Sequence, residues 1–129
     1  MANSSILIID DDQDLTSALQ TVLESSQYSV RVAGNPDEGM VKLNAEKPDL
    51  IILDVMMTTW QDGFDMARKL KKDDEFKAIP ILMLTGVEDK TGMDFKSDAG
   101  DKDWLPVETF LQKPVEPATL LAEVKKLLA

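Results

Sequence analysis

The chain has 129 residues, of which 43% are hydrophobic and 29% are charged. That length and composition fit one globular domain, and we expect residues 1–129 to form a single domain. Acidic residues outnumber basic ones by 24 to 14. The resulting net charge of −10 argues against nucleic acid as a direct partner, because phosphate backbones attract Lys and Arg. It is compatible with a short basic segment of another protein.

Cys and His are both absent, which narrows the chemistry that the chain can perform. There can be no disulfide and no thiolate metal site, and the commonest general base is missing. Any reaction must therefore use carboxylates, hydroxyls or Lys. The opening MANSSILII has no basic segment before its apolar run, and no run is long enough to span a bilayer. We expect a cytoplasmic protein that does not bind membranes.

Strand-like and helix-like segments alternate along the first part of the chain. Ile6–Ile9 and Leu50–Leu53 are continuous apolar runs, which are typical of strands buried on both faces. Tyr28–Ala33 is a third run, rich in strand-forming residues. Apolar residues at helical spacing predict an amphipathic helix over residues 14–25. The residues that set this spacing are Leu15, Ala18, Leu19, Val22 and Leu23.

A helix-start signal lies between the second and third of these runs. Asn35 is a favourable N-cap, the Pro that follows it suits the first helical position, and Glu38 is placed to complete a capping box. We expect this helix to run to about Glu46. Its inward-facing residues should include Met40 and Leu43.

The next helix and strand continue the alternation. Gly63 precedes a predicted helix that runs from Phe64 to about Lys72. The apolar run Ile81–Leu84 then predicts a fourth strand, which ends at Thr85.

The remaining segment is less regular. Residues 86–108 have poor periodicity, and they favour either a short, irregular helix near Lys90–Ala99 or a long loop. Thr109–Leu111 predicts a short fifth strand, and Pro117 begins a last helix. The apolar face of this helix consists of Leu120, Leu121, Val124, Leu127 and Leu128.

The alternation of strands and helices predicts an α/β fold with a parallel sheet covered by helices on both faces. In open sheets of this kind, ligands bind beyond the carboxyl ends of the strands. The polar residues at those ends are Asp10 and Asp11 after the first strand, Asp54 after the third, Thr85 after the fourth and Lys113 after the fifth.

These strand ends bring carboxylates, a hydroxyl and an ammonium group to one edge. Clustered carboxylates without His or Cys are ligands for a hard cation such as Mg²⁺, which offsets their mutual repulsion. A metal, a Lys and a Thr around one Asp can also stabilise a phosphoryl group that the Asp carboxylate attacks. Asp12 and Asp14 need no such role, because negative charge is favourable at the start of a helix.

Five motifs resemble those of the receiver domain of two-component response regulators. They occur in that family's order and extend over the whole chain. They are ILIIDD (6–11), LIILDVMM (50–57), DGF (62–64), PILMLTG (80–86) and FLQKP (110–114). The resemblance implies a doubly wound, flavodoxin-like sheet of five strands in the order 2-1-3-4-5, and a phosphoprotein of phosphorelay signal transduction rather than an enzyme.

The resemblance also implies roles for individual residues. Asp54 would be the phosphoacceptor. Asp11 and Asp54 would ligate Mg²⁺ together with the backbone carbonyl of Met56, and Asp10 would act on the ion through water. Further along the chain, Thr85 and Lys113 would hold phosphoryl oxygens, and Phe110 matches the aromatic residue that follows the Thr hydroxyl when phosphate arrives.

The implied partner is a histidine kinase or a histidine phosphotransfer protein, since a chain without His cannot be its own donor. We expect no DNA-binding or enzymatic output domain, because the chain ends with its last helix. Signalling would then proceed through altered docking to another, unidentified protein. Two segments depart from the family pattern: the loop 57–63, where Gly63 comes one residue late, and the extended segment 101–109.

Two other functions compete with this interpretation. One is a degenerate receiver that binds partners without being phosphorylated, and it should bind no Mg²⁺. The other is a phosphohydrolase of the haloacid dehalogenase type, whose DxDxT signature DQDLT (12–16) matches. In that case Asp12 would be the nucleophile, although it lies two residues beyond the first strand.

Overall fold

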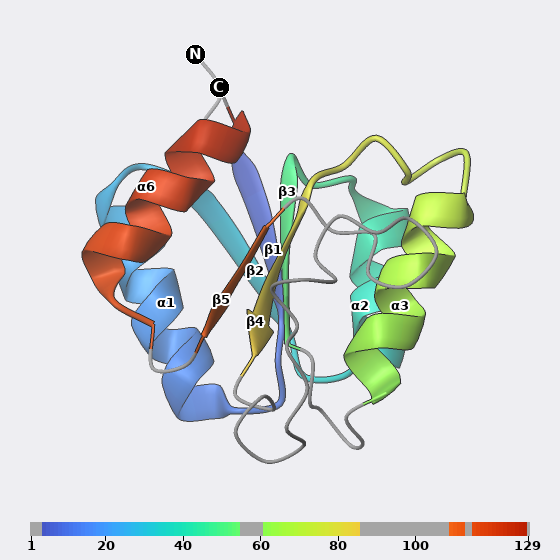
Figure 1. Ribbon diagram of the computed structural model, residues 1–129, viewed down its shortest axis with the longest axis horizontal. Coiled ribbons are helices and arrows are strands. Elements are labelled where there is room, and N and C mark those ends of the chain that lie inside the picture. The colour runs from blue at the N-terminus through green and yellow to red at the C-terminus, as the bar shows by residue number, and fades with distance from the viewer. Residues whose placement is uncertain (1–3, 55–60, 86–108, 113–114, 129) are drawn as a thin grey trace.

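The computed structural model describes residues 4–54, 61–85, 109–112 and 115–128 (Figure 1). The irregular segment 86–108, with its predicted fourth helix, lies outside the described residues. The described elements are β1 (Ser5–Ile9), α1 (Gln13–Ser25), β2 (Ser29–Ala33), α2 (Pro36–Ala45), β3 (Leu50–Asp54), α3 (Gln61–Lys72), β4 (Ile81–Thr85), β5 (Thr109–Gln112) and α6 (Pro117–Leu128).

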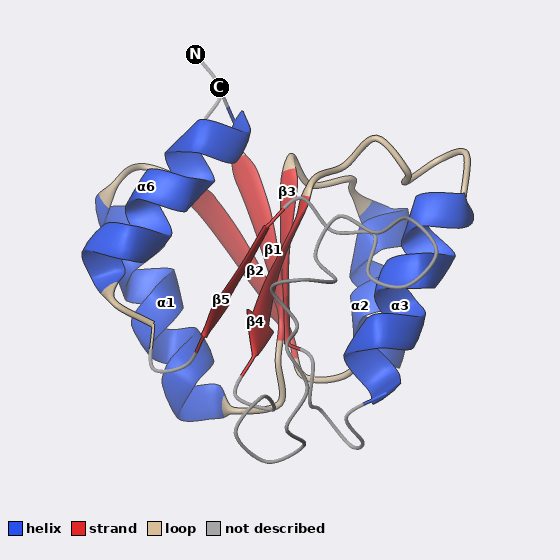
Figure 2. Ribbon diagram, in the orientation of Figure 1, coloured by secondary structure: helices blue, strands red, loops and turns tan. Residues whose placement is uncertain are grey.

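The five strands form one parallel sheet in the order β2-β1-β3-β4-β5. Helices α1 and α6 cover one face of this sheet, and α2 and α3 cover the other (Figures 1 and 2). The predicted fold class is therefore confirmed, and β1 and β3 are neighbours within the sheet. In the described part of the chain, no helix is both long and apolar enough to cross a bilayer.

The apolar side chains of the strands alternate between two hydrophobic clusters, one on each face of the sheet. Leu7 and Ile9 belong to the cluster beneath α2 and α3, whereas Ile6 and Ile8 belong to the cluster beneath α1 and α6. All four side chains are fully buried. Continuous apolar runs are the sequence signature of such doubly covered strands, and that is why the strands could be predicted.

Helix α1 packs on the sheet through a different stripe from the one predicted. Leu19 and Leu23 are buried as expected, but Ala18 is exposed and Thr16 is 5% exposed. Thr16, Leu19 and Leu23 follow the spacing i, i+3, i+7 of one helix face. The buried Thr hydroxyl donates to the carbonyl oxygen of Gln13 at 3.1 Å, so it lies in the core without a lost hydrogen bond.

Helix α2 begins where predicted, with a small change in its capping. The side chain of Asn35 accepts from the backbone N–H of Glu38 at 2.8 Å. The Glu38 carboxylate reaches back to the N–H of Gly34 at 3.0 Å, one residue before the group that a capping box would use. At the other end of α2, the guanidinium of Arg31 donates to the carbonyl oxygens of Lys42 at 3.0 Å and Glu46 at 2.7 Å.

Helix α3 begins at Gln61, three residues earlier than the predicted start at Phe64. Gly63 therefore lies in the first turn and does not stop the helix. The first N–H groups of a helix have no intrahelical acceptor, so a Gly costs little there. After α3, the connection to β4 contributes Phe76 and Ile79 to the core beneath α2 and α3, at 2% and 9% exposure.

Candidate functional site

The sheet register brings two acidic side chains together. Ile9 pairs with Leu53 between the parallel strands β1 and β3. The next residues, Asp10 and Asp54, therefore lie side by side where these strands end. Each is only 2% exposed. Two carboxylates are thus held at the buried edge where ligands bind in sheets of this kind.

Backbone hydrogen bonds hold the chain around Asp10. The N–H of Asp10 donates to the carbonyl oxygen of Ala33 at 3.0 Å, which extends the pairing of β1 with β2 by one residue. The Asp10 carboxylate accepts from the N–H of Asp12 at 2.9 Å. This bond turns the chain away from the strand direction, so that the Asp11 side chain is exposed beside a buried Asp10.

Asp10, Asp11 and Asp54 each contribute a carboxylate oxygen to one group in which all the oxygens lie within 4.8 Å of one another. Opposite ligands of an octahedral Mg²⁺ are about 4.2 Å apart, twice the metal–oxygen distance. The spacing and the all-oxygen donor set therefore fit a hard cation bound by two buried carboxylates and one that reaches solvent.

Asp12 and Asp14 lie close by in sequence and serve α1. Asp12 is the N-cap, and its carboxylate accepts from the N–H of Leu15 at 3.1 Å. Asp14 stands in the first turn, where negative charge meets the positive end of the helix. A dehalogenase-type reaction would need Asp12 as its nucleophile. The structure uses that carboxylate to cap a helix, which disfavours this alternative.

The other predicted site residues are placed only in part. Thr85 ends β4, one residue beyond Leu84, which pairs with Asp54. Phe110 lies within β5, but its side chain and that of Thr85 are outside the described part of the structure. Met56 and Lys113 lie outside the described residues altogether. Their predicted roles stay predictions.

One feature that supports the site was not identified from the sequence. Gly39, inside α2, packs against the end of β1. A Cβ at this position would lie 2.7 Å from Cδ1 of Ile9, the residue that precedes Asp10. A Gly in the interior of an otherwise well-capped helix was the available signal for this close approach.

A comparison with protein families matches residues 6–125 to the response regulator receiver domain. Among individual proteins, PilH of Pseudomonas aeruginosa is 33% identical over 124 residues, which cover 96% of this chain and 97% of PilH. PhoP of Bacillus subtilis, the alkaline phosphatase synthesis transcriptional regulatory protein, is 34% identical over 126 residues. That match covers 98% of this chain and 49% of PhoP, so the chain spans about half the length of this relative.

Solved structures give the same result at the level of the fold. A response regulator from Chloroflexus aurantiacus has a TM-score of 0.84 and 31% identity, and the match covers 98% of both chains. The chemotaxis protein CheY4 of Vibrio cholerae also has a TM-score of 0.84, at 28% identity, with 98% of this chain and 100% of that one covered.

Proposed function

Because this chain belongs to the response regulator receiver family, we propose that it takes a phosphoryl group from a phospho-histidine onto Asp54. The observation that carries the proposal is the group of carboxylate oxygens from Asp10, Asp11 and Asp54 within 4.8 Å of one another. One nucleophile and two further carboxylates then lie at the end of neighbouring strands, as a metal-assisted phosphoryl transfer requires.

The proposed reaction is an in-line displacement at phosphorus. A carboxylate oxygen of Asp54 attacks, and an O–P bond forms as the P–N bond to the donor imidazole breaks. The imidazole nitrogen takes up a proton, and Asp54 becomes an acyl phosphate. The burial of Asp54 supports this role, because a nucleophile at 2% exposure is shielded from competing water.

Mg²⁺, when bound, would neutralise charge on the phosphoryl oxygens. Asp11 and Asp54 would hold it directly, with the backbone carbonyl of Met56, and Asp10 would act through water. Thr85 and Lys113 would donate to the remaining phosphoryl oxygens. In this proposal Thr85 is aligned with the site by the register of β4, in which the preceding Leu84 pairs with Asp54.

The donor would be a histidine kinase or a histidine phosphotransfer protein, since the chain contains no His. Output would pass through altered docking to another protein, with Phe110 as the residue that senses phosphorylation. The chemistry is confined to the chain's own phosphorylation and dephosphorylation. Nucleic acid is not among the proposed partners of these 129 residues, whose net charge is −10.

The test is phosphoryl labelling with acetyl phosphate in the presence of Mg²⁺. Asp54→Asn should abolish the hydroxylamine-sensitive label, because an amide is a poor nucleophile for phosphorus. Asp49→Asn is the matched control and should label normally. Asp49 directly precedes the same strand but lies at its opposite end, where it accepts from the N–H of Ser5 at 2.8 Å.

Two results would contradict the proposal. Retained acyl-phosphate label in Asp54→Asn would place the phosphoacceptor elsewhere. A wild-type chain that neither labels nor binds Mg²⁺ would instead be a degenerate receiver that acts as a binding module. Isothermal titration with Mg²⁺ alone separates these outcomes, since it does not depend on a phosphodonor.

A further inference from the structure

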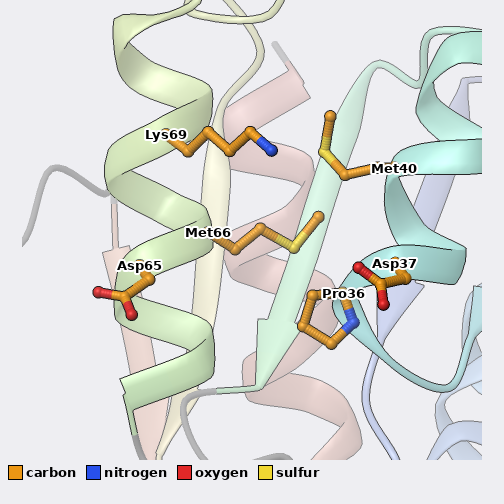
Figure 3. A pocket seen from close by; sticks show the side chains of 6 residues that line it. All are labelled: Pro36, Asp37, Met40, Asp65, Met66 and Lys69. Carbon is orange, nitrogen blue, oxygen red and sulfur yellow. The ribbon is translucent and has the colours of Figure 1, made fainter.

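A hollow of about 200 Å³ opens between α2 and α3, on the outer side of the helices that cover one face of the sheet. Pro36 and Met40 of α2 face Met66 of α3 across it (Figure 3). Met side chains are flexible and adapt to what they contact, so this floor can accept an apolar group of another molecule.

The charged residues around the hollow are divided between its ends. Asp37 lies beside Pro36 at one end, and Lys69 lies across from Met40 at the other (Figure 3). Asp65 also lines the hollow, but it pairs with Arg68 at 3.0 Å. In the described part of the chain, Asp37 and Lys69 form no side-chain hydrogen bond or ion pair. An acidic end and a basic end are therefore available to a partner.

An exposed apolar side chain stands next to the hollow. Val41 is 68% exposed, and it is the large hydrophobic residue that stands out on the described surface. It lies one helical turn beyond Asp37 on the same side of α2 and follows Met40. The face made by Asp37, Met40, Val41, Met66 and Lys69, called here the α2–α3 face, thus combines a protruding apolar group with a recess.

We propose that the α2–α3 face pairs with the same face of a second copy of this chain about a two-fold axis. A two-fold axis places the acidic end of one copy against the basic end of the other, so Asp37 would meet the partner copy's Lys69 twice. The same operation sets each Val41 toward the other copy's recess. A surface that carries both halves of each contact is complementary to itself.

The overall charge sets the expected strength of this pairing. Two copies that each carry a net charge of −10 repel one another at a distance, so association depends on local contacts at the α2–α3 face. We therefore expect a weak dimer with a dissociation constant on the order of 0.1 mM. The proposal does not depend on phosphorylation, because no residue of this face belongs to the acidic site.

Sedimentation equilibrium of the whole chain, from about 1 μM to about 1 mM, measures the dimer constant directly. Val41→Asp should weaken the dimer about tenfold or more, because it places a carboxylate against an apolar recess. Ala18→Asp is the matched control and should leave the constant unchanged. It adds the same charge at an exposed position on α1, on the other side of the sheet.

A charge swap tests the two-fold pairing itself. Lys69→Asp should weaken the dimer about fivefold, because each Asp37 then meets a like charge. The double variant Asp37→Lys with Lys69→Asp should restore the wild-type constant, while Lys72→Asp, on α3 but outside the hollow, should change it little. Circular dichroism confirms that each variant is folded.

Three results would overturn the proposal. They are a wild-type chain that stays monomeric over the whole concentration range, a dimer that Val41→Asp leaves intact, and a charge swap that binds no better than Lys69→Asp alone. Acetyl phosphate labelling is independent of all three, so a failure here can be told apart from a failure of the proposed phosphoacceptor.

Discussion

Two groups of acidic side chains lie within a few residues of each other, and the structure places them in opposite environments. Asp10 and Asp54 end neighbouring strands and are 2% exposed. Asp12 and Asp14 open α1, where they are exposed to solvent and to the positive end of the helix. The same carboxylate is therefore a burden in the first place and a stabilising group in the second.

This difference makes the two groups respond differently to a cation. Two like charges about 4.8 Å apart repel with an energy of order 3 kcal/mol at an effective dielectric constant of about 20. Bound Mg²⁺ reverses that term for Asp10 and Asp54. It should leave Asp12 and Asp14 almost unaffected, because their favourable partner is the helix itself. Each substitution below tests one side of this contrast.

The largest effect is expected for the buried pair. Without Mg²⁺, Asp10→Asn and Asp54→Asn should each raise the free energy of unfolding by about 1–2 kcal/mol, because one of two like charges disappears. With Mg²⁺ at about ten to thirty times its dissociation constant, the wild type should gain about 1.4–2 kcal/mol and the variants almost nothing. The sign of the difference should therefore reverse. Urea unfolding with EDTA and with Mg²⁺ measures both states, and variants less stable than wild type in EDTA would contradict the repulsion argument.

Asp11 separates metal binding from burial, because it belongs to the carboxylate group but is exposed. Asp11→Asn should weaken Mg²⁺ binding about tenfold, or about 1.4 kcal/mol, through loss of a charged ligand. Its free energy of unfolding in EDTA should stay within about 0.5 kcal/mol of wild type, since water already screens this charge. Titration calorimetry gives the first quantity and urea unfolding the second. Unchanged Mg²⁺ affinity would remove Asp11 from the metal site.

The sequence predicted the sheet well and the connections less well. Continuous apolar runs identify strands because burial on both faces leaves no polar alternation, so the strand order followed once the helices were placed between them. Phe76 and Ile79 were not identified as core residues, since they lie in a connection without helical or strand periodicity. The start of α3 was placed too late because Gly63 was interpreted as a stop signal, although the first turn tolerates Gly.

The site shows the same division. The grouping of Asp10 with Asp54 could be predicted, because the carboxyl ends of adjacent parallel strands meet at one edge. The role of Asp12 followed from its position before a helix. The bond from Asp10 to the Ala33 carbonyl and the approach of Gly39 to β1 could not be predicted. Both depend on how far apart two elements lie, and no local pattern records that distance.

The N-cap provides the next smaller effect. Asp12→Ala removes the acceptor of the Leu15 N–H, which the carboxylate binds at 3.1 Å, and should lower the free energy of unfolding by about 1 kcal/mol. The loss should be the same with EDTA and with Mg²⁺, unlike that of the buried pair. Asp12→Ser, which keeps an acceptor, is the matched control and should recover most of the stability. A loss in Asp12→Ala that depends on Mg²⁺ would instead assign Asp12 to the metal site.

The smallest effect is expected for Asp14, which acts only through its charge in the first turn of α1. Asp14→Asn should lower the free energy of unfolding by about 0.3–0.5 kcal/mol at low ionic strength, and the difference should vanish in about 1 M salt, where the Debye length is only about 3 Å. Glu24→Gln is the matched control, because Glu24 lies near the other end of the same helix, where a negative charge is unfavourable. Its replacement should stabilise the protein slightly, with the same dependence on salt. If both substitutions shift stability in the same direction, the helix dipole does not explain the charge of Asp14, and the contrast between the two groups of acids rests on Asp12 alone.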